Sequence, residues 1–350
     1  MTASPSGSPL LSVRDLKVHF PIRGKRMVVH AVDGVSFDLH KGRTLAIVGE
    51  SGSGKTTTAL AVMRLAPVTH GKITFDGVDL TSLEGEQLRQ QRRNWQLIFQ
   101  DPYSSLNPRQ RAGSIVRTPL QLMKIGTPQE QADRVDELFR LVGLRPDQKV
   151  LFPHQFSGGQ RQRLSIARAL ATSPRLIVCD EPVSALDIAI RAQILNLLRK
   201  IQREQGQSFL FISHDMSVVQ HICDDIAVMY LGQIVEQASR EAFFSRPLHP
   251  YSVALMSAVP TVRGGREKAA NRIRLSGEPP SPISPPPGCR FAGRCPAAQD
   301  ICHQQPPELR EVVPGHTVAC HFVRTENGNL VAPLDQHTQP SLQGSLEHAH

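Results

Sequence analysis

Continuous apolar runs in the first 260 residues predict strands that are buried on both faces. Leu176–Val178 and Phe209–Ile212 lack the alternation of a half-exposed strand, as expected for parallel strands in a covered sheet. Thr44–Val48 is a third compact apolar run, and it leads directly into a glycine-rich loop. Helical spacing follows in Thr57–Leu65 and in Ile190–Ile201. The pattern therefore predicts an α/β fold in which helices cover both faces of a parallel sheet.

Changes in composition along the chain predict its domain organisation. Three further segments predict strands: Leu11–Phe20, Ala31–Leu39 and Lys72–Phe75. Residues 101–171 are more polar and helix-like, so we expect a helical subdomain inserted there. After about residue 260 the chain becomes rich in proline, then in cysteine, and finally polar. We expect a flexible N-terminus over 1–10, a main domain over 11–260, a proline- and cysteine-rich domain over 261–326 and a disordered tail over 327–350.

Composition and charge narrow the classes of function. The 350 residues have a formal net charge of +9, and aromatic residues make up only 5%. So few aromatic residues argue against a platform that stacks nucleic-acid bases. The chain also lacks a long Lys/Arg block that would indicate a nucleic-acid partner. The N-terminus lacks the features of a signal peptide, and no apolar run approaches the roughly 20 residues that span a bilayer. We expect a cytosolic chain with six reduced cysteines that can dock on a membrane protein.

The loop after Thr44–Val48 has the spacing of a phosphate-binding loop. Its glycines let backbone N–H groups approach phosphate oxygens, and the following helix points its positive end at the anion. Lys55 is expected to reach the β- and γ-phosphates, and the Thr56 hydroxyl to bind Mg²⁺. The residues expected to bind ATP here are Gly49, Glu50, Ser51, Gly52, Ser53, Gly54, Lys55, Thr56 and Thr57. This loop alone predicts a nucleotide triphosphatase of the broad P-loop class.

Two acidic residues follow the second buried strand. Asp180 ends the apolar run and is placed to hold Mg²⁺ beside the phosphate loop. Glu181 is placed to polarise a water in line with the γ-phosphate, as a general base. Two acids can also simply end a strand, but the phosphate loop upstream favours catalysis.

A second segment has the features of an anion site. Ser157, Gly158, Gly159 and Gln160 precede a helical run, so they offer a hydroxyl, open backbone N–H groups and a helix N-terminus. Ser157 alone could be an ordinary helix cap. One ATP hardly needs two distant phosphate sites on one chain. We therefore expect two subunits arranged head to tail, in which each ATP contacts one subunit's loop and the other's serine segment.

These motifs, in this order, resemble the ATP-binding subunits of ABC transporters from about Leu11 to Phe322. The resemblance implies an ABC-type nucleotide-binding domain with a RecA-like core, an antiparallel β subdomain, an inserted helical subdomain and a small Cys-rich C-terminal extension. It also implies four further roles. Phe20 would stack on adenine, Gln100 would meet Mg²⁺, Asp187 would lie at the subunit interface and His214 would contact the γ-phosphate.

The resemblance is closest to the dipeptide and oligopeptide importers. It rests on the segments 101–109, 251–255 and 285–289. It implies an ATP hydrolase and translocase on the cytoplasmic face of the inner membrane. The expected partners are a second, different ATPase subunit, two membrane permeases and an extracytoplasmic peptide-binding protein, with no nucleic acid. Import of another small solute such as a nickel complex, and a non-transport ABC ATPase acting in DNA repair or on ribosomes, remain alternatives.

The cysteines divide into two groups. Cys179 and Cys223 lie in the core pattern and are expected to be buried hydrophobic residues. The others lie in the proline-bounded region: Cys289, Cys295, Cys302 and Cys320. Their spacing lacks the close pairs of most structural zinc sites, yet four thiolates can hold zinc or a [4Fe–4S] cluster. The importer resemblance favours the cluster. Four unligated cysteines, and an iron–sulfur regulator with incidental ATP binding, are the remaining alternatives.

Overall fold

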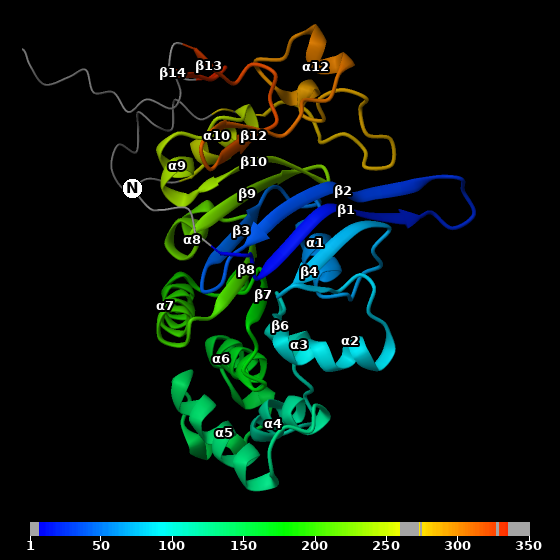
Figure 1. Ribbon diagram of the computed structural model, residues 1–350. Coiled ribbons are helices and arrows are strands. Elements are labelled where there is room, and N and C mark those ends of the chain that lie inside the picture. The colour runs from blue at the N-terminus through cyan, green and yellow to red at the C-terminus, as the bar shows by residue number, and fades with distance from the viewer. Residues whose placement is uncertain (1–6, 260–272, 274, 327–328, 335–350) are drawn as a thin grey trace, which may run out of the picture.

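The smaller of the two main sheets is antiparallel and lies over one face of the molecule (Figure 1). The computed structural model describes residues 7–259, 273, 275–326 and 329–334. The sheet has the order β2-β1-β4-β5. Its strands are β1 (Leu11–Pro21), β2 (Val28–Leu39), β4 (His70–Phe75) and β5 (Val78–Asp79). This is the antiparallel subdomain that the family resemblance implied.

The larger sheet has eight strands and forms the centre of the protein. Its strands are β3 (Thr44–Val48), β6 (Trp95–Ile98), β7 (Leu176–Asp180), β8 (Ser208–Ser213), β9 (Asp225–Tyr230), β10 (Gln233–Ser239), β11 (Arg310–Val313) and β12 (His316–Val318). They lie in the order β11-β12-β10-β9-β3-β8-β7-β6. The five strands from β9 to β6 are parallel, and the others pair antiparallel. Every residue of β3, β7 and β8 is buried, which confirms the prediction from their continuous apolar runs.

Helices cover both faces of the larger sheet. α1 (Lys55–Val62) lies between the two sheets. Its buried side chains belong to a hydrophobic core that also includes side chains from β1, β3 and β8. On the opposite face lie α7 (Ile188–Gln205), α8 (Met216–Ile222), α9 (Arg240–Ser245) and α10 (Pro250–Ser257). None of the described helices combines the length and apolar character that a bilayer crossing needs. The layers therefore match the predicted α/β fold with two covered faces.

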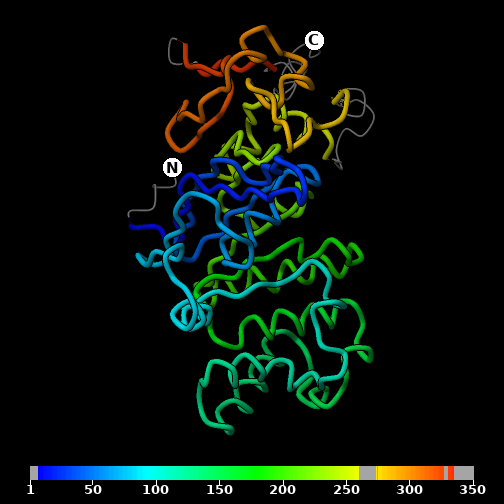
Figure 2. Tube along the Cα trace, turned by 90° about the vertical axis from the view of Figure 1, so that its right-hand side faces the viewer, coloured from blue at the N-terminus to red at the C-terminus, as the bar shows by residue number. Residues whose placement is uncertain are grey.

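The helical subdomain lies at one end of the molecule, opposite the C-terminal region (Figures 1 and 2). Its helices are α3 (Pro102–Ser105), α4 (Ala112–Leu122), α5 (Pro128–Leu141) and α6 (Gly158–Leu170), with short turns η2 (Pro146–Val150) and η3 (Pro153–Gln155). α2 (Gly85–Gln91) and η1 (Arg92–Asn94) precede it. α6 also packs on β6 and α7, so the subdomain joins the core along this helix.

The C-terminal region is joined to the central sheet. β12 pairs with β10, which places β11 and β12 at one end of the eight-stranded sheet. At this junction the buried carboxylate of Glu236 accepts hydrogen bonds from the N–H groups of Leu248 and His249 and contacts His316 Nε2 at 2.7 Å. The region also contains η4 (Ala292–Arg294), α12 (Asp300–Gln304), β13 (Arg324–Glu326) and β14 (Asn329–Val331).

These strand pairings bear on two expectations from the sequence. The cysteine-rich segment is not a separate extension, because its hairpin continues the main sheet. The disordered tail expected from residue 327 does not hold for residues 329–331, which pair with β13. The rest of that tail, 327–328 and 335–350, and the first six residues of the expected flexible N-terminus lie outside the described residues. Leu10, also within that N-terminus, is buried and accepts a hydrogen bond from the Asp76 N–H.

Candidate functional site

The glycine-rich loop connects the end of β3 to the start of α1, as predicted. Gly49 and Gly54 have positive φ angles of 156° and 105°. A Cβ atom on Gly49 would lie 2.1 Å from the carbonyl oxygen of Met229, and one on Gly54 would lie 2.3 Å from that of Ala31. Both positions therefore require glycine for steric reasons as well as for backbone conformation. Close packing against β9 and β2 therefore constrains the backbone conformation of the loop.

Lys55 and Thr56 connect this loop to the neighbouring strand. Lys55 Nζ donates to the carbonyl oxygens of Gly49 and Glu50 at 2.9 and 2.7 Å. Burial lowers the pKa of Lys55, while the nearby Glu181 and Asp180 carboxylates act in the opposite direction. Thr56 Oγ1 donates to Asp180 Oδ1 at 3.0 Å. The phosphate loop and the first acidic residue are therefore in direct contact.

The acidic pair lies at the carboxyl end of β7. Asp180 is the last residue of the strand, and its burial raises its pKa, although the hydrogen bond from Thr56 opposes this shift. Glu181 has a φ of 46°, which is uncommon for a residue with a side chain. Its N–H donates to the Ile212 carbonyl at the end of β8. The chain thus turns sharply at Glu181 and directs the two carboxylates differently.

Two further predicted residues converge on Glu181. Gln100 Nε2 donates to Glu181 Oε2 at 3.1 Å, and His214 Nδ1 lies 2.8 Å from Glu181 Oε1. The Glu181 side chain is only 15% exposed. Both carboxylate oxygens therefore have a fixed partner, and the group is oriented as a general base needs to be. Loops after β3, β6, β7 and β8 supply the whole cluster, because the carboxyl ends of parallel strands share one edge of the sheet.

The serine segment lies outside this cluster. Ser157 caps α6: its Oγ accepts from the Gln160 N–H, while Gln160 Oε1 accepts from the Ser157 N–H. A Cβ on Gly159 would lie 2.5 Å from Ile190 Cγ2 of α7. Within the part of the chain that the structure describes, no hydrogen bond joins residues 157–160 to the phosphate loop. Cap and anion-site interpretations are compatible, since both use the same helix N-terminus.

Phe20 and Asp187 lie on the surface near this edge. Phe20, near the end of β1, is 38% exposed and pairs with Val29 of β2. Asp187 precedes α7 and is exposed, and its neighbour Ile188 is 84% exposed.

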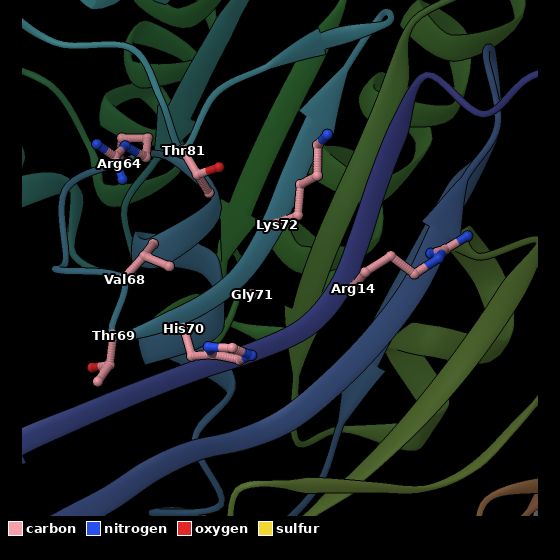
Figure 3. Close-up of a pocket in the computed structure, with 8 residues that line it drawn as sticks. All are labelled: Arg14, Arg64, Val68, Thr69, His70, Gly71, Lys72 and Thr81. Atoms are coloured by element: carbon pink, nitrogen blue, oxygen red, sulfur yellow. The ribbon is translucent and has the colours of Figure 1, made fainter.

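A hollow on the antiparallel sheet is basic but does not form a convergent site (Figure 3). The side chains of Arg14, Arg64 and Lys72 point in different directions there. The basic side chains are also paired with acids or backbone: Arg14 with Asp38 at 2.6 Å, His70 with Asp15 at 3.1 Å, Lys72 with Asp79 at 3.4 Å and Arg64 with the Leu83 carbonyl. An anion would have to compete with these partners.

The four C-terminal cysteines line one small cavity. Cys289, Cys295, Cys302 and Cys320 face it together with His249. Among the described residues, no three of these sulfurs lie within 4.8 Å of one another. A single tetrahedral zinc with Zn–S bonds of about 2.3 Å would need closer sulfurs. Burial raises the pKa of Cys289 to about 11 and that of Cys295 to about 12, so the surroundings of these sulfurs are apolar.

The motifs did not include two side chains that hold the phosphate loop. Arg294, one residue before Cys295, forms an ion pair with Glu50 at 2.8 Å. The Tyr251 hydroxyl accepts a hydrogen bond from the Glu50 N–H at 2.7 Å. Tyr251 belongs to the segment 251–255, on which the resemblance to peptide importers partly rests. The sequence of this segment does not indicate which residue Tyr251 contacts.

Comparison with family models gives two matches, which cover separate segments of the chain. The model described as ABC transporter matches residues 32–184. The model described as the C-terminal region of oligopeptide/dipeptide transporters matches residues 235–302. The first contains the phosphate loop and the acidic pair, and the second begins in β10.

Similar proteins support both matches. The oligopeptide transport ATP-binding protein AppF of Bacillus subtilis is 50% identical over 92% of this chain and 99% of its own length. A putative peptide import ATP-binding protein of Brucella ovis is 49% identical over 89% of this chain and 98% of its own length.

Solved structures share the fold of the main domain. An ATP-binding cassette in a dimeric, post-hydrolysis state with ADP and Pi is 27% identical, with a TM-score of 0.59 over 66% of this chain and 98% of that one. Clostridium perfringens cbiO1, part of an ABC transporter complex, is 25% identical, with a TM-score of 0.63 over 76% of this chain and 100% of that one.

Proposed function

Because the chain belongs to the ATP-binding proteins of oligopeptide ABC transporters, we propose that it hydrolyses ATP to energise peptide uptake across the cytoplasmic membrane. One observation carries the hydrolytic part of this conclusion: Lys55, Thr56, Asp180 and Glu181 meet at one edge of the central sheet. The match over residues 235–302 carries the choice of peptides as cargo. The protein is thus an ATP hydrolase that acts as part of a translocase.

The residues of the cluster divide the work. The loop from Gly49 to Thr57 binds the phosphates, and Lys55 moves from its carbonyl partners to the β- and γ-phosphates. Thr56, Asp180 and Gln100 hold Mg²⁺, which neutralises charge on the phosphate oxygens. Glu181 accepts the proton of the attacking water. His214, in contact with Glu181, orients that carboxylate and contacts the γ-phosphate.

Two ATPase subunits form the working unit. Residues 157–160 bind the ATP held by the partner's phosphate loop. In support, they form a helix N-terminus and, among the described residues, share no hydrogen bond with this chain's own loop. Asp187 and the exposed Ile188 lie at the interface. A dimeric ATP-binding cassette with ADP and Pi has the same fold. The partner is a second, different ATPase. Phe20 is exposed on β1 and stacks on the adenine ring.

The transporter supplies the membrane-spanning parts. By its similarity to peptide importers, two permease subunits form the channel and this protein lies on the cytoplasmic face of the inner membrane. A peptide-binding protein outside the membrane delivers the cargo. Closure of the ATPase dimer reaches the permeases through the surface around Gln100 and residues 101–109.

The C-terminal cysteines hold a [4Fe–4S] cluster. This proposal is supported by the four sulfurs that line one cavity, and by the absence of a close trio of these sulfurs among the described residues, which a zinc ion would favour. The cluster cross-links a region with few apolar residues of its own. Anaerobic purification and an absorbance spectrum test this proposal. A brown protein with about four irons per chain supports the cluster, whereas a colourless protein with zinc or no metal contradicts it.

Reconstitution of the complete transporter tests the function. The chain, its ATPase partner, two permeases and the binding protein are placed in liposomes. ATP-dependent uptake of labelled di- and oligopeptides is then measured. We expect peptide movement only when ATP is supplied on the side of the membrane that carries the ATPase subunits. Uptake of nickel complexes without peptide uptake would identify the other cargo, and co-purification with DNA or ribosomes would contradict transport.

A further inference from the structure

Glu50, the second residue of the phosphate loop, is held by the C-terminal part of the chain. Its two carboxylate oxygens accept from the two terminal nitrogens of Arg294, at 2.8 and 3.2 Å. Its N–H donates to the Tyr251 hydroxyl at 2.7 Å. Its carbonyl oxygen accepts from Lys55 Nζ at 2.7 Å. Every polar group of this one residue therefore has a partner.

The side chains that hold Glu50 rest on a rigid base. The Arg294 side chain is only 9% exposed and lies over the Tyr230 ring, with 5.9 Å between its guanidinium carbon and the ring centre. Tyr230, Tyr251 and Phe291 are buried and contact one another, with ring centres 4.8 to 5.4 Å apart. Packed aromatic rings allow little movement. A displacement of Arg294 would therefore be transmitted to Glu50.

A second arginine fastens the same segment to the nucleotide side of the core. Arg290 donates to the Leu231 carbonyl and pairs with Asp33 of β2. Arg290 and Arg294 thus attach one short segment at two places, at β2 and at the phosphate loop. This gives the segment a defined position relative to both.

Glu50 has four partners, because its carbonyl oxygen also accepts from the Ser53 N–H at 3.2 Å, and the contact with Lys55 is the one that ATP binding can weaken. Lys55 has three N–H donors, so it must release at least one of its two loop carbonyls to donate to both the β- and the γ-phosphate. The contacts of Glu50 with Arg294, Tyr251 and the Ser53 N–H do not involve Lys55, so they remain to hold the loop. Arg294 would also balance the charge of the Glu50 carboxylate once phosphates occupy the loop, since an unpaired carboxylate there would repel them.

We propose that Arg294 and Tyr251 are positioning residues of the ATP site, which act through Glu50 to keep the phosphate loop in its ATP-binding shape. The C-terminal region is then part of the machinery for nucleotide binding. This inference rests on the proposed binding of ATP by the chain. It gives the C-terminal region, which matches the family model of oligopeptide/dipeptide transporters, a direct effect on the affinity for ATP.

The affinity for ATP and the steady-state kinetics of variants test the proposal. The dissociation constant of a fluorescent ATP analogue is measured with the full-length chain, and KM and kcat with the assembled transporter. We expect Arg294→Met to raise both the dissociation constant and KM about tenfold and to change kcat less than about twofold, since the catalytic residues are untouched. Arg294→Lys should recover part of the affinity. Tyr251→Phe should raise KM about two- to threefold.

A double-mutant cycle of Glu50 and Arg294 distinguishes a positioning role of Arg294 from a role in the stability of the fold alone. In the Glu50→Gln background the repulsive carboxylate is gone, so Arg294→Met should weaken ATP binding by no more than about twofold. Arg324→Met is the matched control, because Arg324 lies in the same region and its exposed side chain pairs only with Glu326 among the described residues. Its ATP affinity should equal that of the unmodified chain. Melting temperatures and iron content of all variants are recorded alongside.

The contrary results are distinct. If Arg294→Met lowers the melting temperature but leaves the dissociation constant and KM unchanged, the arginine only supports the fold and the inference is wrong. Equal effects of Arg294→Met in the unmodified chain and in the Glu50→Gln background also overturn it. If Arg294→Met does not fold, Glu50→Gln and Tyr251→Phe decide: affinity unchanged in both contradicts the inference. Failure of the unmodified chain to bind ATP would contradict the proposed function itself.

Discussion

The ATP site and the C-terminal region are built in opposite ways. In the ATP site, each chemical group lies in a short motif at the end of a strand, and the parallel sheet brings the motifs together. In the C-terminal region, the important contacts join residues far apart in the sequence. Arg294 contacts a residue 244 positions away, and Arg290 contacts one 257 positions away. Chemistry is thus encoded locally, whereas attachment of the C-terminal region depends on the finished fold.

The largest expected effect separates chemistry from stability. Glu181→Gln should lower ATP turnover by roughly 10²–10⁴-fold, the typical contribution of a positioned general base. Binding of ATP and the melting temperature should stay unchanged, because the amide keeps the size of the side chain. Turnover is measured by phosphate release. Glu204→Gln, at an exposed position of α7, is the control. Unchanged hydrolysis in Glu181→Gln would remove this residue from the mechanism.

The second prediction concerns the joint of the C-terminal region. Glu236→Ala removes the acceptor for two buried N–H groups and for His316, so it should lower the free energy of unfolding by about 3 kcal/mol. Chemical denaturation measures the loss. ATP turnover per folded molecule should change little. Glu311→Ala, on the exposed side of neighbouring β11, should cost much less. Equal losses of unfolding free energy in the two variants would show that the buried Glu236 carboxylate stabilises the fold no more than an exposed one.

An intermediate effect is expected at the surface beside the ATP site. Ile188→Asp places a charge where we propose a subunit interface, so it should weaken ATP-induced association of the two ATPase subunits about tenfold. Analytical ultracentrifugation of the Glu181→Gln background measures this. Val150→Asp, at another exposed apolar position in the helical subdomain, should leave association intact. Normal association of Ile188→Asp would place the interface elsewhere.

The smallest effect is expected at Phe20. Phe20→Ala should raise the dissociation constant of ATP about fivefold, the low end for loss of an aromatic ring stacked on a base. Phe20→Tyr should preserve affinity. The same measurement with tripolyphosphate should show no difference between Phe20→Ala and the unmodified chain, because that ligand has no base. An equal loss for both ligands would mean that the ring supports the loop instead.

The sequence allowed the fold, and the meeting of the main candidate site residues, to be predicted because the relevant signals are local. Continuous apolar runs identified β3, β7 and β8, and the order of the motifs placed Lys55, Asp180 and Glu181 at one sheet edge. The face-to-face arrangement of Ser157 and a partner's phosphate loop stays a prediction, since it belongs to a second subunit.

The remaining features depend on contacts that no local pattern contains. β10 was not among the predicted strands, because Glu236 interrupts its apolar pattern. That carboxylate is buried only because its partners come from residues 248, 249 and 316. Equally, the gathering of four cysteines in one short segment predicted a metal site, but it could not reveal that Arg294 beside them contacts the phosphate loop.

The pairing of β12 with β10 has a practical consequence for anyone who trims this chain. Stopping near residue 260, where composition alone suggests a boundary, would strip β10 of its neighbour and leave a row of open backbone groups along its edge. It would also take His316 away from a buried acid. Such a fragment should form inclusion bodies or pair edge to edge, so a shortened ATPase will need the hairpin at 310–318 to remain in solution.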